Sequence, residues 1–177
     1  RKDLETIENK FFKNEEDKID AVVIVANHVE ENKLVVIRQF RVPINGYVIE
    51  LPAGLVDGNE SFEEAVKREL KEETGIDIEK EELEPFMMIK HLSKNYSNKG
   101  KNRCNVILYY ICTTNKKPDL SKTNYTAYEE KGDFKLVYVP LEKAEETLID
   151  QANKCPSFRP IAYEMLGVLT EYIKENL

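Results

Sequence analysis

The chain has 177 residues, of which 41% are hydrophobic and 33% are charged. This length suits one well-packed domain and is short for two. The formal net charge of −7 at pH 7 argues against non-specific nucleic-acid binding, because such binding needs a basic face. No apolar run approaches the length of a membrane span, so we expect no part of the chain to lie in a membrane.

The cysteines indicate a reducing compartment. Cys104, Cys112 and Cys155 are odd in number, widely spaced and free of any C-x-x-C pairing, which is not the pattern of a disulfide framework. Residues 1–18 are charged rather than signal-like. We therefore expect a cytoplasmic protein whose cysteines fill core positions.

Strand and helix patterns alternate along the chain after residue 18. Runs rich in β-branched residues predict strands at 19–26, 34–41, 47–50, 84–91, 104–113 and 134–139, the first two forming a hairpin. Helical spacing predicts helices at about 61–74, 141–152 and 158–175. In the last helix the apolar stripe consists of Ile161, Met165, Val168, Leu169 and Tyr172. This order favours an α/β protein, a three-layer α/β/α sandwich with a mixed β-sheet spanning residues 19–177.

The helix predicted at 61–74 has clear ends. Ser61 with Glu64 three residues later forms a capping box, and Gly75 is a typical left-handed stop. At about 100° per residue, one face of this helix begins with apolar side chains and ends with acidic ones. The apolar members are Phe62, Ala65 and Val66, and the acidic members are Glu69, Glu72 and Glu73.

Three carboxylates turned inward repel one another and oppose the helix dipole at this end of the helix. A divalent cation removes that conflict, and an oxygen-only site favours magnesium (Mg²⁺), with manganese (Mn²⁺) as the alternative. Glu69, Glu72 and Glu73 are therefore candidate metal ligands. The alternative is an ordinary solvated acidic helix end.

The segment from Gly54 to Ile76 resembles the signature of the Nudix hydrolases. That signature is a glycine, five residues, a glutamate, seven residues, and then Arg-Glu-apolar-any-Glu-Glu-any-Gly-apolar, and the segment matches it at Gly54, Glu60, Arg68, Glu69, Leu70, Glu72, Glu73, Gly75 and Ile76. The resemblance implies the Nudix fold and a magnesium site that acts on a pyrophosphate. It also implies Glu69 and Glu73 as principal ligands, Glu72 as an assisting ligand, and Glu60 and Arg68 as orienting groups.

Two segments upstream are similar to the branch that cleaves ADP-ribose and other nucleoside diphosphate sugars. They run from Arg38 through Arg41 to Pro43 and from Glu50 to Gly54. The similarity implies Arg41 and Glu50 as substrate-binding residues and the backbone carbonyl of Ala53 as a metal ligand. Arg38, at the end of the same predicted strand, is a second candidate for the diphosphate, the alternative being a surface arginine.

Two polar loops carry further candidates. In the loop at 93–103, Tyr96 could stack on a base, although a solvated hairpin loop explains the same composition. Relatives often carry a proline here, and positions 86–103 contain none, so the substrate stays open. The loop from Thr114 to Asp133 is too long to be structureless. The resemblance implies a general base in it, with Glu130 preferred and Glu129 as the fallback, against a plain charged turn.

The sequence thus predicts a magnesium-dependent hydrolase of a nucleoside diphosphate linked to a second moiety, with ADP-ribose giving AMP and ribose 5-phosphate. Alternative substrates are another nucleotide sugar, a dinucleotide or a nucleoside triphosphate. A non-catalytic nucleotide-sensing Nudix module is the alternative outside enzymes. The resemblance also favours a homodimer over a monomer, with residues 1–18 as a segment that could take part.

Overall fold

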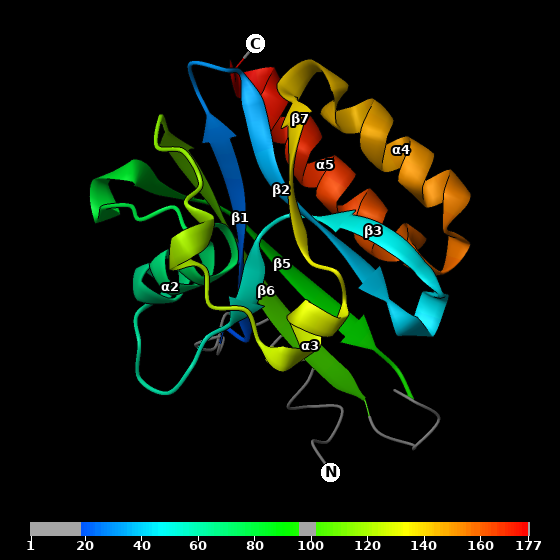
Figure 1. Cartoon of the computed structure of the whole chain (residues 1–177). Helices are drawn as coiled ribbons and strands as arrows, with labels where there is room; N and C mark the ends of the chain where they lie inside the picture. The colour runs from blue at the N-terminus through cyan, green and yellow to red at the C-terminus, as the bar shows by residue number, and fades with distance from the viewer. Residues whose placement is uncertain (1–18, 96–101, 177) are drawn as a thin grey trace.

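The computed structural model of the chain describes residues 19–95 and 102–176 (Figure 1). The expected role of the segment 1–18 in a dimer and the candidate Tyr96 lie outside the described residues. They stay predictions.

Seven strands form one sheet. They are β1 (Ala21–His28), β2 (Lys33–Arg41), β3 (Gly46–Glu50), β4 (Ala53–Leu55), β5 (Leu83–Ser93), β6 (Arg103–Thr114) and β7 (Lys135–Pro140). The order is β3-β2-β1-β6-β5, with β4 paired to β1 and β7 paired to β2. The predicted hairpin of β1 and β2 is confirmed, with Ala26 opposite Val35. Because β1 and β6 run parallel while the other pairs run antiparallel, the sheet is mixed as predicted.

Helices cover both faces of the sheet (Figure 1). Helix α2 (Phe62–Thr74) packs its residues Ala65, Val66 and Leu70 on one face, whereas α4 (Ala144–Lys154) and α5 (Arg159–Asn176) pack on the other. The three-layer α/β/α arrangement is therefore confirmed. No helix among the described residues is long and apolar enough to cross a membrane.

Several local predictions were wrong. The apolar stripe predicted for the last helix is buried at Met165, Val168, Leu169 and Tyr172, whereas Ile161 is 47% exposed and does not belong to the core. Residues 141–143 form a 3-10 turn that precedes α4. The short strand β4 and the five-residue helix α3 (Ala127–Lys131) were not predicted, because neither is long enough to show a periodic pattern.

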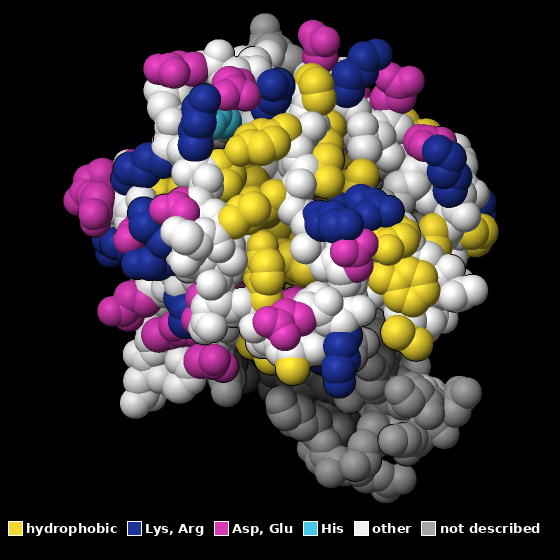
Figure 2. Space-filling view, in the orientation of Figure 1, with side chains coloured by type: hydrophobic (Ala, Val, Ile, Leu, Met, Phe, Trp, Pro, Cys, Tyr) yellow, Lys and Arg dark blue, Asp and Glu magenta, His cyan; other side chains and the backbone are white. Residues whose placement is uncertain are grey.

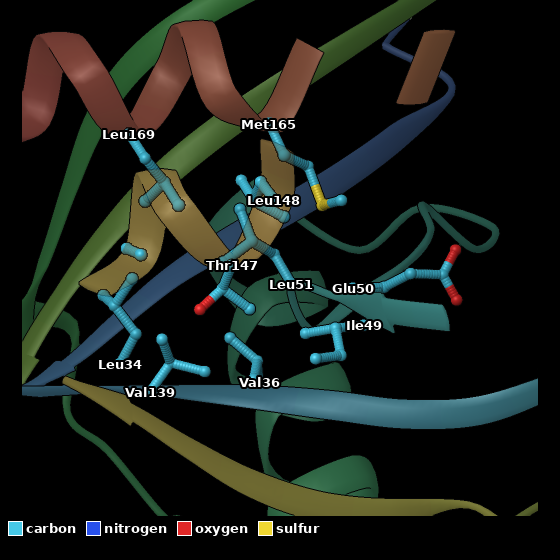
Figure 3. Close-up of a pocket in the computed structure, with 11 residues that line it drawn as sticks. Leu34, Val36, Ile49, Glu50, Leu51, Val139, Thr147, Leu148, Met165 and Leu169 are labelled. Carbon is cyan, nitrogen blue, oxygen red and sulfur yellow. The ribbon is translucent and has the colours of Figure 1, made fainter. Parts of the chain in front are cut away.

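The core between the sheet and helices α4 and α5 reaches the end of β3 (Figure 3). A small cavity of about 10 Å³ there is lined by Leu34, Val36, Leu148, Met165 and Leu169 among others, with Glu50 at its rim. Figure 3 shows the Glu50 carboxylate directed away from these apolar side chains. The stem of Glu50 is therefore set against the core while its charged end is left for polar partners.

Candidate active site

Helix α2 presents the acidic residues in the register that its caps define. Ser61 accepts a hydrogen bond from the Glu64 backbone N–H, the Glu64 side chain accepts one from the Ser61 backbone N–H, and Gly75 ends the helix with φ 72°. Both ends match the predicted capping box and left-handed stop. The buried stripe runs through Ala65 and Leu70 to Glu73.

Glu73 is the most deeply buried of the signature carboxylates, at 7% exposure. Its Oε2 accepts a hydrogen bond of 3.1 Å from the backbone N–H of Ala53 on β4. Burial, reinforced by the nearby charge of Glu69, raises the pKa of Glu73 well above its ordinary value, although the Ala53 N–H opposes this shift. The ionised form of Glu73 is thus unfavourable in free energy unless a cation binds next to it.

Glu69 lies on the same side of the helix and is half-buried. Burial raises the pKa of Glu69, and a hydrogen bond of 2.7 Å from Arg68 Nη1 to Glu69 Oε1 opposes the shift. A Cβ added at Gly54 would lie 1.7 Å from Glu69 Oε1. The missing side chain at Gly54 therefore leaves the space that the Glu69 carboxylate fills.

Arg68 links Glu69 to Glu60 and to the backbone of Leu55. Its Nε and Nη2 donate to the two carboxylate oxygens of Glu60 at 3.1 Å and 2.8 Å, and Nη2 also donates to the Leu55 carbonyl at 2.9 Å. The hydrogen bond with Arg68 lowers the pKa of Glu60, and Glu60 in turn raises that of Arg68. This bidentate contact fixes the guanidinium beside Glu69.

Glu72 stands at the edge of the same surface with 37% of its side chain exposed. Its carboxylate lies 3.5 Å from Arg68 Nη1 and 3.5 Å from the side-chain nitrogen of Asn124. Glu72 thus has weaker contacts than Glu69 and more freedom to move.

Strand β2 supplies the groups that face α2 across the site. Arg41 donates through Nε and Nη2 to Glu50 Oε2 at 3.1 Å and 2.8 Å, and Gln39 Nε2 donates to the same oxygen at 2.7 Å. Gln39 is 7% exposed and was not a candidate from the sequence. The period of two along a strand is the signal that could have found it, because it places Gln39 on the same face as Arg41.

These groups meet in one cavity of about 250 Å³, which we call the candidate pocket. It is lined by Ile37, Gln39, Arg41, Glu50, Leu51, Ala53, Glu73, Thr126 and Glu129. Residues from β2, β3, β4, α2 and α3 therefore converge at one place although they are far apart in the sequence. Glu69 lies beside the pocket, close enough that its charge acts on Glu73.

The two loop glutamates differ in where they lie. Glu129 lines the candidate pocket, and its side chain accepts a hydrogen bond of 2.6 Å from the Thr126 backbone N–H at the start of α3. Glu130 is exposed and does not line the pocket. The structure thus brings the fallback candidate, rather than the preferred one, to Glu73.

Arg38 lies away from the candidate pocket. Its guanidinium carbon sits 3.5 Å from the centre of the Tyr47 ring, and its Nη1 is 3.9 Å from Asp133 Oδ2. It lines a separate recess that includes Gln151 of α4. Arg38 and Arg41 are three residues apart on one strand and so face opposite sides of the sheet, and only Arg41 is brought to the acidic residues.

The donor set fits a hard divalent cation. Glu69 and Glu73 are sequestered carboxylates whose pKa values are raised by burial and by the charges of neighbouring carboxylates, and oxygen donors of this kind suit magnesium or manganese. As the side chains stand, no three Asp, Glu, His or Cys groups within residues 19–95 and 102–176 form a ready metal cluster.

Parts of the chain are similar to known proteins. The chain is 36% identical over 78 residues to an ADP-ribose pyrophosphatase of Bacillus subtilis, covering 44% of this chain and 42% of that protein. It is 35% identical over 69 residues to an ADP-sugar pyrophosphatase of Mus musculus, covering 39% of this chain and 32% of the relative. The chain thus spans less than half the length of these curated relatives.

A solved structure from a study of MutT of Aliivibrio salmonicida and Vibrio cholerae has the same fold. It superposes with a TM-score of 0.51 at 18% identity and covers 84% of this chain and 97% of that one. The model of the NUDIX domain family matches residues 17–157. That match includes α2, every strand and the whole candidate pocket, and the chain therefore belongs to the NUDIX domain family.

Proposed function

We propose that the protein hydrolyses the pyrophosphate bond of a nucleoside diphosphate linked to a second moiety. The single observation that carries this proposal is the candidate pocket, in which Glu73, Glu129 and Arg41 share one cavity of about 250 Å³. Buried carboxylates beside a cationic fork are the combination that a metal-assisted attack on a phosphoanhydride requires. A solvated acidic helix end would not account for a Glu73 side chain at 7% exposure.

The acidic residues of α2 have the role of cation ligands in this proposal. Glu69 and Glu73 would hold magnesium, or manganese, with Glu72 and the Ala53 carbonyl assisting, while Glu60 and Arg68 keep Glu69 in place. When bound, the cation neutralises charge on the phosphate oxygens and lowers the pKa of a bound water.

Arg41 and Glu129 act on the substrate and on the water. Arg41 is oriented by its two-pronged contact with Glu50, so its guanidinium is set to bind a phosphate oxygen. A water molecule attacks phosphorus and gives its proton to the Glu129 carboxylate, while the bond between phosphorus and the bridging oxygen breaks and the second phosphate leaves. Glu129 is the proposed base because it lines the pocket and Glu130 does not.

ADP-ribose is the proposed substrate, with AMP and ribose 5-phosphate as products. Support comes from the segments Arg38 to Pro43 and Glu50 to Gly54 and from relatives named ADP-ribose pyrophosphatase and ADP-sugar pyrophosphatase. Other nucleotide sugars, dinucleotides and nucleoside triphosphates remain the competing substrates within this chemistry.

A substrate panel tests the proposal. The chain is incubated with Mg²⁺ and ADP-ribose, other nucleotide sugars, a dinucleotide or a nucleoside triphosphate, and the released AMP or phosphate is measured. We expect the fastest turnover with ADP-ribose and none after EDTA is added. Turnover of another compound would change the substrate, whereas binding without turnover of any compound would favour a sensing module.

A further inference from the structure

The loop that carries Glu129 lies against the C-terminal end of α2. A Cβ added at Gly75 would lie 1.9 Å from the carbonyl oxygen and 2.9 Å from the nitrogen of Asp119. Real Cβ atoms do not approach backbone atoms so closely, so this contact is possible only with glycine. Gly75 therefore has two functions: its φ of 72° ends the helix, and its bare Cα admits the loop.

A hydrogen bond secures the same contact five residues further along the loop. The backbone N–H of Asn124 donates to the carbonyl of Glu72 at 2.9 Å, and the Asn124 side-chain nitrogen lies 3.5 Å from Glu72 Oε1. The last carbonyls of a helix have no partner within the helix, so the loop supplies the donor that α2 lacks. We call the Gly75–Asp119 and Asn124–Glu72 contacts together the loop clamp.

The far end of the loop is attached to β2. The backbone N–H of Phe40 donates to the Gly132 carbonyl at 2.6 Å, and Phe40 precedes Arg41 on the strand. The ring of Tyr125, which follows Asn124, packs against the ring of Phe134, which lies just beyond Gly132, with centroids 4.8 Å apart. They belong to a groove of about 480 Å³ beside β7, and Figure 2 shows hydrophobic side chains gathered there. The loop that contains α3 is thus attached at one end to α2, which carries the proposed metal ligands, and at the other end to β2, which carries the proposed phosphate-binding residue Arg41.

We propose that the backbone N–H of Asn124 and the bare Cα of Gly75 position the loop and so set the distance between Glu129 and the carboxylates of α2. Thr126 and Glu129 line the candidate pocket, and Thr126 is two residues after Asn124. Because so few bonds separate the clamp from the pocket, a loop released at Asn124 moves Glu129 directly. The inference rests on the proposed function for its catalytic consequence, but the clamp itself is observable without any substrate.

A pair of substitutions at one position isolates the hydrogen bond. Asn124→Pro removes the backbone N–H, whereas Asn124→Ala keeps it and removes only the side-chain amide. Thr123 has φ −71° and ψ 152°, a conformation that a residue before proline adopts readily. We expect Asn124→Pro to lower kcat by about 10- to 100-fold with KM for substrate within about threefold, and Asn124→Ala to stay near wild type. A smaller folded fraction would also lower the apparent kcat at constant KM, so each rate is divided by the folded fraction of that variant, measured by circular dichroism.

A second pair isolates the close approach. Gly75→Ala adds a methyl group that meets Asp119 and also places alanine at a positive φ of 72°, whereas Gly58→Ala places alanine at a positive φ of 52° with no atom within 4 Å. We expect the kcat of Gly75→Ala to fall at least about tenfold below that of Gly58→Ala. Equal values for the two variants would show that the contact with Asp119 has no effect on the site.

Hydrogen exchange measures the clamp independently of activity. In the wild-type protein without substrate, we expect the Asn124 amide to exchange at least about tenfold more slowly than an exposed loop amide, and we expect peptides over 127–131 to exchange faster in Gly75→Ala than in Gly58→Ala. A fast-exchanging Asn124 amide would overturn the clamp even if the enzyme is active. If no compound of the panel is hydrolysed, the proposed function fails while this measurement still decides the clamp. If Asn124→Pro does not fold, exchange in the wild type and the glycine pair decides.

Discussion

The backbone N–H of Ala53 donates a hydrogen bond of 3.1 Å to Glu73 Oε2, and within residues 19–95 and 102–176 it is the one neutral donor that lowers the pKa of this buried carboxylate. A carboxylate accepts several hydrogen bonds when its charge is fully satisfied. The negative charge of Glu73 is therefore only partly compensated in its buried position. The strand β4, which supplies its hydrogen-bond donor, also supplies Gly54, whose bare Cα accommodates Glu69.

Glu73→Gln tests the role of this carboxylate in catalysis. The change keeps the shape and an acceptor for the Ala53 N–H but removes the negative charge that a cation needs. We expect kcat with ADP-ribose and Mg²⁺ to fall by at least about 10²–10³-fold. Glu81→Gln, at an exposed position, is the control. Activity within a few-fold of wild type would contradict the assignment of Glu73.

We expect Glu73→Gln to stabilise the metal-free protein although it lowers activity. Because the folded-state pKa of Glu73 is raised above the unfolded value, the folded protein binds the proton more tightly. Its contribution to the free energy of unfolding is present below the unfolded pKa and is lost as pH rises through the folded pKa. We expect metal-free Glu73→Gln to melt at least about 2 °C above wild type at pH 8, with a smaller gap at pH 4.5. Scanning calorimetry at both values checks this, and a gap that grows on acidification would refute it.

Magnesium should stabilise the wild type by binding to the folded state alone. At a concentration of about 100 times its dissociation constant, a ligand raises the free energy of unfolding by about 2.7 kcal/mol. We expect MgCl₂ at pH 8 to raise Tm of the wild type, EDTA to reverse the rise, and Glu73→Gln to respond little. NaCl at equal ionic strength is the control. Equal shifts in both proteins would place the cation elsewhere.

The loop glutamates form a matched pair. Glu129 lines the candidate pocket and the neighbouring Glu130 does not. We expect Glu129→Gln to lower kcat by about 10²–10⁴-fold, as the loss of a general base does, with Glu130→Gln close to wild type. Initial rates at saturating substrate separate them. The opposite order would restore Glu130 as the base.

The two arginines of β2 form another pair. Arg41 contacts Glu50 at the pocket, whereas Arg38 lies over Tyr47 on the other face of the sheet. Lysine keeps the charge but loses the two-pronged geometry. We expect Arg41→Lys to raise KM for ADP-ribose by about tenfold, since this corresponds to one lost charge-assisted hydrogen bond, and Arg38→Lys to leave KM unchanged. Steady-state kinetics checks both variants, and a larger rise of KM in Arg38→Lys than in Arg41→Lys would contradict the assignment of Arg41.

The sequence was most informative where one local rule sufficed. The caps of α2 and the inward turn of Glu73 follow from residue types at fixed spacings, and the structure has both. The layers of the fold follow from alternation and helical periodicity in the same way. The face of β2 occupied by Gln39 was equally readable, because alternate residues of a strand share a face.

Other features depend on contacts between distant segments. The choice between Glu129 and Glu130 depends on α3, a five-residue helix whose flanking residues Asn124 and Gly132 are hydrogen-bonded to Glu72 and Phe40. Neighbouring residues on a helix differ by about 100° in direction, so an unpredicted helix leaves that choice open. The contact of Gly75 with Asp119 likewise appears only in three dimensions.

The parallel pairing of β1 with β6 has a consequence for how the chain is made. Asp20 Oδ2 accepts a hydrogen bond from the Val106 backbone N–H, a partner 86 residues away in the sequence. During synthesis, β1 leaves the ribosome long before β6 exists, so the edge of β1 that pairs with β6 stays unpaired until β6 is made. Contacts between residues so far apart in the sequence slow folding and prolong exposure to aggregation. A nascent chain that stalls before residue 103 can pair β1 with β2 and β4 but leaves the other edge of β1 without its native partner β6.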